Sequence, residues 1–162
     1  MFSEHRYWHG NEPCHQIAYL FNYAGQPWKT QREVRHIMET EYLNAPGGLS
    51  GNDDAGQMSA WYVFSAMGFY PVCPGTPYYI IGSPSFPRMS ICLENGKTFT
   101  ILAHNANEKN VYIQSARLNG KEYDKNYFTH QDIVQGGTLE FQMGPNPNPN
   151  WGASTSAYLQ KQ

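Results

Sequence analysis

The character of the chain changes once, in the proline-rich stretch between Pro71 and Pro77. Before this stretch, apolar residues recur at the three- and four-residue spacing of helices, and after it they alternate as in strands. Helices followed by strands are typical of an α+β fold with segregated layers. We therefore expect a helical part over 1–76, an antiparallel β region over 77–144 and a flexible tail over 145–162.

Three helices are expected in the first part, and the third is the most informative. The first two cover about 13–23 and 27–42, where apolar residues share one face. The third should begin at Asn52 or Asp53, whose side chains can cap free amide groups, and end before Gly68. No face of this third helix is clearly polar, so we expect it to pack inside a larger helical assembly.

The second part of the chain predicts paired strands that form a small antiparallel sheet or sandwich. Two hairpin signals, Glu94-Asn95-Gly96 and Asn119-Gly120, separate runs of alternating or β-branched residues. Strands are accordingly expected over 88–93, 98–103, 111–118 and 138–143. Beyond them, the alternating Pro and Asn residues from Pro145 cannot bury enough surface to order the tail, although Trp151 could dock.

Charge and cysteine usage exclude several classes of function. The formal net charge is −2 and the basic residues are scattered, so the basic patch of a nucleic-acid-binding protein is missing. No apolar run approaches the roughly 20 residues of a membrane span, and the first 30 residues contain no export signal. The three cysteines form no CxxC pair, which argues against a zinc site.

The densest group of chemically useful side chains is Gly51-Asn52-Asp53-Asp54-Ala55-Gly56-Gln57. Its adjacent carboxylates lie at the expected start of a buried helix, where the helix dipole and free amides stabilise negative charge. One carboxylate could serve as a base that takes a proton from water. The plainer interpretation is a helix cap, and the pattern alone does not decide between them.

A second group, His9-Gly10-Asn11-Glu12-Pro13-Cys14-His15-Gln16, also lies at a turn into a helix. Its oxygen-bearing side chains could hydrogen-bond sugar hydroxyls or bind a hard cation such as calcium. Ordinary surface or hydrogen-bonded histidines are the favoured interpretation of His5, His9 and His15, because no zinc-ligand spacing accompanies them. Among the tryptophans, Trp8, Trp28 and Trp61 could present stacking faces, with core packing as the default.

Two stretches carry a resemblance to a known family: YWHGNEPCHQIAYLFNYAGQPWKTQREVRHIM and GLSGNDDAGQMSAWYVFSAMGFYPVCPGTPYYIIGSP. In order and separation they resemble the C-terminal catalytic region of glycoside hydrolase family 92, and the likeness continues to about Gly144. The resemblance implies a calcium-dependent exo-α-mannosidase that inverts configuration. It also implies a β-sandwich domain and an (α/α)6 barrel, of which the helices of this chain would form the end.

The resemblance also implies roles for individual residues. It places the catalytic base at Asp54, with Asp53 as the second choice. Positions that would hold the terminal mannose are Asn11, Glu12, His15 and Asn52, and positions that would hold Ca²⁺ are Glu12 and Gln16. The expected partners are mannose-containing glycans, with α-1,2 linkages first, and the N-terminal part of the same enzyme. Relatives imply a periplasmic or extracellular location in a full-length bacterial protein.

The resemblance also implies that the chain is several times shorter than members of that family and that the general acid belongs to an upstream segment. The acidic residues of the second helix, Glu33, Glu39 and Glu41, are expected to face solvent and are not candidates for that acid. We therefore expect this chain to be inactive alone. Two alternatives stay open: a carbohydrate-binding module in the β-rich half, and a structural half that folds only with the missing segment.

Overall fold

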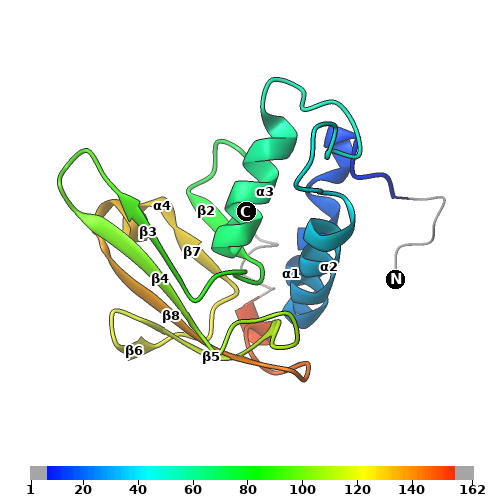
Figure 1. Cartoon of the computed structure of the whole chain (residues 1–162). Helices are drawn as coiled ribbons and strands as arrows, with labels where there is room; N and C mark the ends of the chain where they lie inside the picture. Colours follow the sequence, from blue (N-terminus) through cyan, green and yellow to red (C-terminus); the bar gives the residue numbers. More distant parts are fainter. Residues whose placement is uncertain (1–6, 156–162) are drawn as a thin grey trace.

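A three-stranded antiparallel sheet lies between the helices and a five-stranded sheet (Figure 1). Its strands contribute side chains to two hydrophobic cores. The computed structural model describes residues 7–155. The central sheet contains β1 (Phe69–Tyr70), β2 (Tyr78–Ile81) and β7 (Tyr127–Thr129), with β2 in the middle. Successive side chains of a strand point to opposite faces, so each strand contributes to both cores.

The two faces of this sheet are both buried. The face toward the helices carries aromatic and aliphatic side chains from all three strands: Tyr70, Ile80 and Tyr127. The opposite face carries their sequence neighbours: Phe69, Ile81 and Phe128. The fold therefore has three layers, helices, central sheet and outer sheet, which confirms the α+β class.

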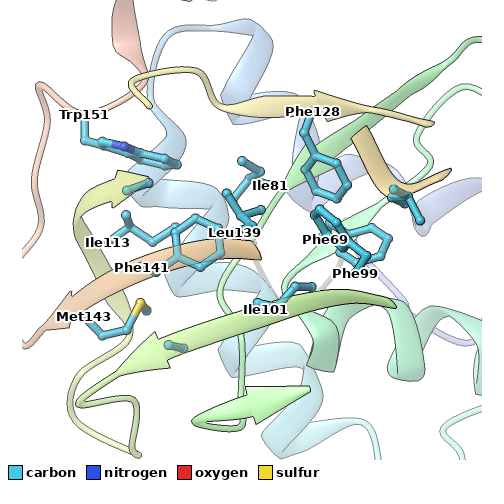
Figure 2. Close-up of a cluster of buried hydrophobic side chains, with 13 residues drawn as sticks. Phe69, Ile81, Phe99, Ile101, Ile113, Phe128, Leu139, Phe141, Met143 and Trp151 are labelled. Carbon is cyan, nitrogen blue, oxygen red and sulfur yellow. The ribbon is translucent and has the colours of Figure 1, made fainter. Parts of the chain in front are cut away.

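The outer sheet has five strands in the order β3-β4-β8-β5-β6. They are β3 (Arg88–Cys92), β4 (Thr98–His104), β5 (Tyr112–Leu118), β6 (Lys121–Glu122) and β8 (Gly137–Gly144), with the short helix α4 (His130–Val134) before β8. Its inward side chains pack against the central sheet to form the core drawn in Figure 2, including Phe99, Ile101, Ile113, Leu139, Phe141 and Met143. Both predicted hairpins are present.

One pairing differs from the expected antiparallel sheet, because β8 runs parallel to β4. The chain leaves β4, forms β5, β6, β7 and α4, and then returns to insert β8 between β4 and β5. As a result, β8 pairs parallel with β4 and antiparallel with β5. Hairpin signals report only adjacent strands, so the sequence pattern contained no sign of this pairing.

The helical layer holds α1 (Leu20–Tyr23), α2 (Pro27–Thr40) and α3 (Gln57–Met67). The single helix expected over 13–23 is instead two 3-10 turns, Glu12–Cys14 and Ile17–Tyr19, followed by α1. In these turns the amides of His15 and Tyr19 bond three residues back rather than four. The third helix begins at Gln57, later than predicted, because a turn of left-handed residues precedes it.

Helix α2 is more deeply embedded than its amphipathic pattern predicted. Glu33 was expected to face solvent but is only 5% exposed, and its carboxylate accepts a hydrogen bond of 2.7 Å from Nε of Arg32. Arg35 is also buried and donates to the carbonyl oxygens of Pro84 and Asn107 at 2.9 and 3.2 Å. Loops next to the outer sheet, at Pro84 and Asn107, thus cover a side of α2 that helical periodicity assigned to water.

The described part of the expected flexible tail, 145–155, folds back onto the outer sheet. Trp151 is 7% exposed and packs edge-on against Phe141, as Figure 2 shows. Its indole Nε1 donates to the carbonyl of Tyr123 at 3.1 Å. This ordered segment, which ends in a 3-10 turn at Ala153–Thr155, differs from a loose tail. Residues 156–162 lie outside the described residues.

Membrane insertion finds no support in the helices described over 7–155. The longest of them, α2, has 14 residues, and none is long and apolar enough to cross a bilayer.

Candidate active site

The two chemically rich loops meet where Gly10 and Gly51 cross. A Cβ added to Gly51 would lie 2.6 Å from the Cα of Gly10, which is closer than any real side chain allows. The indole Nε1 of Trp8 donates to the carbonyl of Ser50 at 3.2 Å and joins the same two loops. Glycine at both positions therefore permits the backbones to touch and brings residues some 40 positions apart into one site.

The crossing brings the carboxyl groups of Glu12 and Asp54 together on the molecular surface, where they share a hydrogen bond. That bond raises the pKa of Asp54, with repulsion from Glu12 and Asp53 adding to it, and it lowers the pKa of Glu12. Two carboxylates held at this spacing repel each other, so the site favours a bound proton or cation.

The turn that carries Asp54 has an unusual backbone. Asp54, Ala55 and Gly56 are three consecutive residues with positive φ, at 50°, 58° and 94°. The first two are not glycines, and such conformations concentrate at functional sites. The left-handed turn delays α3 until Gln57 and leaves the Asp54 side chain exposed to solvent.

Asp53 performs the capping that the sequence predicted, although from outside the helix. Its side-chain Oδ1 accepts from the amide of Ser59 at 2.9 Å, and its carbonyl accepts from the amide of Met58 at 3.2 Å. Asp53 therefore supports the first turn of α3. Of the two neighbouring carboxylates, only Asp54 points to the partner loop.

The remaining predicted site residues divide into exposed and buried positions. Asn11 and Asn52 are exposed on the two loops, and Gln16 is half-buried. His15 is 1% exposed, and both of its ring nitrogens are engaged, Nε2 with the carbonyl of His9 at 2.9 Å and Nδ1 with the side-chain amide of Gln57 at 3.3 Å. His15 faces inward and supports the loop from behind.

Sequence reasoning missed the buried polar network beneath the carboxyl pair. His9 is completely buried between Tyr7 and Tyr42, with ring-to-hydroxyl distances of 2.8 and 2.6 Å. Trp61 packs on His9 with ring centroids 4.3 Å apart, and its Nε1 donates to the carbonyl of His15 at 2.9 Å. This settles Trp61 as a core residue, whereas Trp8 is 58% exposed.

The family to which this chain belongs follows from a match to a known protein family. The model of the Glycosyl hydrolase family 92 catalytic domain matches residues 1–145. The chain belongs to glycosyl hydrolase family 92. Both crossing loops, with Glu12 and Asp54, lie inside the matched region.

Solved family 92 structures share this fold closely. The alpha-mannosidase BT3965 from Bacteroides thetaiotaomicron, in complex with mannoimidazole, is 49% identical with a TM-score of 0.89 over 94% of this chain. The inverting mannosidase BT2199 from the same organism is 48% identical with a TM-score of 0.87 over 92% of this chain. In each case the match covers 20% of the solved chain.

A fungal family relative shows the same partial coverage. It is described as an uncharacterized secreted glycosidase of Arthroderma benhamiae, is 39% identical over 146 residues, and matches over 88% of this chain and 19% of its own length. This family 92 chain thus spans about a fifth of the length of the relatives it matches.

The residues at the crossing could supply some of the oxygen ligands of a Ca²⁺ ion. Calcium takes six to eight oxygen ligands, and paired carboxyl groups are typical donors. The exposed Glu12 carboxyl and the neighbouring Asp54 offer hard oxygen donors at one edge of this family 92 domain, and Gln16 follows Glu12 four positions later in the chain. Over 7–155 no group of three or more His, Cys, Asp or Glu side chains could hold a metal ion.

Proposed function

We propose that this chain forms the C-terminal part of an exo-α-mannosidase that hydrolyses terminal α-mannosides, α-1,2 linked ones first, with inversion of configuration. The observation that carries the proposal is the meeting of Glu12 and Asp54 where the two loops cross. Family membership and the alpha-mannosidase structures that resemble this chain support the choice of substrate.

In this proposal Asp54 is the general base. Its carboxylate, exposed on the left-handed turn, takes a proton from the water that attacks the anomeric carbon. Asp53 is held by the amide of Ser59 and has a supporting role. The second choice of base made from the sequence is therefore disfavoured by its hydrogen bonding.

Glu12 does not qualify as the general acid. The acid and base of an inverting glycosidase stand roughly 6.5 to 9.5 Å apart, which leaves room for water. Glu12 and Asp54 are within hydrogen-bonding distance of each other, so they cannot flank that water. We infer that the acid comes from the upstream part of the enzyme.

Glu12, Gln16 and their neighbours Asn11 and Asn52 hold the cation and the terminal mannose in this proposal. When bound, Ca²⁺ would supply electrostatic stabilisation to sugar hydroxyls and favour ring distortion toward an oxocarbenium-like geometry. Glu12 has a second effect, because its negative charge raises the pKa of Asp54. A cation at Glu12 would offset that repulsion and leave Asp54 ionised as a base needs.

The test is mannose release from α-1,2-mannobiose by this chain alone, by the upstream region of BT3965 alone, and by the two joined or mixed. We expect activity only in the combination, lost with EDTA and with Asp54→Asn, and β-mannose as the first anomer seen by NMR. Comparison with α-1,3- and α-1,6-mannobiose reports linkage preference. Unchanged activity in Asp54→Asn, or α-mannose as the first product, would contradict the proposal.

The carbohydrate-binding alternative receives no support from the β-rich part. Of the large apolar side chains described in 77–144, Phe86 alone is exposed, and the only tryptophan of the C-terminal half, Trp151, is buried. A stacking platform in that region would need several exposed rings. We also propose that the full-length protein acts outside the cytoplasm, because a relative is described as secreted; cell fractionation tests this location.

A further inference from the structure

A fully buried histidine lies directly before the loop that carries Glu12. The two ring nitrogens of His9 each meet a tyrosine hydroxyl, Nδ1 with Tyr7 at 2.8 Å and Nε2 with Tyr42 at 2.6 Å. His9 is 0% exposed, and both of these hydrogen-bonding partners are uncharged hydroxyl groups. A buried imidazole between two hydroxyl groups raises the question of which nitrogen carries the proton.

The hydrogen bonds of Tyr42 show which ring nitrogen of His9 carries the hydrogen. The Tyr42 hydroxyl donates its single hydrogen to the carbonyl of Met58 at 3.0 Å, because a carbonyl oxygen can only accept. The hydroxyl therefore accepts from His9, and Nε2 must carry the hydrogen. Nδ1 is then bare and accepts from Tyr7. Burial, followed by the nearby His15, lowers the pKa of His9 to about 3, which agrees with a neutral ring.

This tautomer connects the two loops of the site through a continuous series of hydrogen bonds. On one side, the His9 ring reaches Tyr42 and through it Met58, whose amide binds the carbonyl of Asp53 beside Asp54. On the other side, the His9 carbonyl accepts from His15 at 2.9 Å and closes the loop that contains Glu12. Replacing His9 or the Tyr42 hydroxyl would therefore break this series of hydrogen bonds between the Glu12 loop and the Asp54 turn.

We infer that His9 is a positioning residue, which as the neutral Nε2–H tautomer holds the Glu12 loop against the Asp54 turn. The inference rests on the proposed function for its effect on catalysis, but its geometric content is independent of that function. Simple packing is the competing explanation, because the His9 ring lies against Trp61 and His15 with centroids 4.3 and 4.7 Å apart. A phenylalanine could keep those ring contacts and lose both hydrogen bonds.

The test compares His9→Phe, Tyr42→Phe and the double variant in the active combination of this chain with its upstream region. Small misplacements of catalytic groups cost up to about 100-fold in rate, so each single variant should lower kcat by at least about tenfold, and KM should rise because the Glu12 loop also holds the mannose. The double variant should be no slower than the worse single variant, because both act through one bond. His9→Gln, whose amide can donate from the Nε2 position, should recover part of kcat.

The matched control is Ile101→Val, which shortens a buried side chain in the outer sheet, far from the loops in sequence. It should lower the melting temperature and leave kcat unchanged. Wild-type kcat in His9→Phe, or an equal loss of kcat in Ile101→Val, would overturn the inference while Asp54→Asn still reports on the proposed function.

A second readout does not depend on mannosidase activity. Hydrogen exchange in the same combination should quicken at the amide of Ser59, which binds Asp53, and at the amide of Cys14, which binds Asn11, when His9 becomes Phe. Exchange in β4 should stay the same. If the wild-type combination releases no mannose, the proposed function fails; if Ser59 and Cys14 exchange at the wild-type rate in His9→Phe, the positioning inference fails.

Discussion

Asp53 and Asp54 are adjacent in sequence and identical in chemistry, yet they have opposite surroundings. Asp53 accepts from the amide of Ser59 and belongs to the start of α3, whereas Asp54 lies on the positive-φ turn and meets Glu12. Family resemblance alone ranked Asp54 first from the sequence. Only the fold shows why its neighbour is committed to the helix.

The first prediction separates these two carboxylates. Asp54→Asn should lower kcat by about 10² to 10⁴, which is the usual contribution of a general base, without unfolding the turn, because Asn tolerates positive φ. Asp53→Asn keeps an oxygen acceptor for Ser59 and should retain most activity. Steady-state kinetics with α-1,2-mannobiose check both variants, and a larger loss in Asp53→Asn would reverse the assignment.

The second prediction concerns the pH dependence of activity. A base acts when ionised, so kcat/KM should fall as pH is lowered through the pKa of Asp54. A cation at Glu12 offsets the effect of Glu12 on that pKa, whereas the repulsion from Asp53 still raises it. Asp53→Asn should therefore move the acid limb to lower pH, which a pH–rate profile at saturating calcium measures. An acid limb that moves to higher pH would show that Asp53 does not raise the pKa of Asp54.

At the scale of elements, the crossing of two loops creates the site. Trp8 binds the carbonyl of Ser50, and Gly10 lies against Gly51 with no room for a side chain on either. The sequence placed both loops at helix starts and assigned them to one site by resemblance. It contained no physical sign that these two glycines touch, because the contact joins positions some 40 residues apart in the chain.

The third prediction follows from that crossing. Gly51→Ala should push the loops apart, since its Cβ would meet backbone atoms of Gly10 at 2.6 and 2.8 Å, and should lower kcat by at least about tenfold. Gly47→Ala is the control. Position 47 has φ of 73° and open space around it, so alanine there should cost about 1 kcal/mol of stability and leave kcat intact. Thermal melting and kinetics on both variants give the comparison.

At the scale of elements, the sequence predicted the strands of the hairpins but not the start of α3. The four strands expected from turn signals are present, because local chemistry decides hairpins. The start of α3 was placed too early, since a left-handed run at Asp54, Ala55 and Gly56 has no compositional mark when two of its three residues are not glycine. The burial of Arg35 also depended on partners about 50 and 70 residues away, the carbonyl oxygens of Pro84 and Asn107.

Across the whole molecule, α3 packs on one side and is open on the other. Met58, Trp61 and Ser65 are buried, whereas Tyr62 and Val63 are 36% and 55% exposed. A larger helical assembly, as expected from the sequence, would cover this exposed side. An exposed apolar helix face is typical of a surface that another element covers.

The fourth prediction is that this open side associates with the upstream part of the enzyme. The chain alone should self-associate, and the paired change Tyr62→Ser with Val63→Lys should make it more monodisperse by removing apolar contact. The same pair should weaken binding to the upstream region, which light scattering and titration calorimetry can measure. Phe86→Ser, a change at another exposed apolar residue, is the control and should leave that binding unchanged. Tight binding by the paired variant would place the upstream contact elsewhere.

The position of β8 has a consequence for synthesis on the ribosome. β4 and β5 emerge first, yet neither has its inner neighbour until Gly137–Gly144 has left the exit tunnel and entered between them. Until then a nascent chain carries two open strand edges, the kind of surface that pairs with other chains. Translational pausing before that point should therefore favour aggregation, whereas a pause placed after the last strand should be harmless.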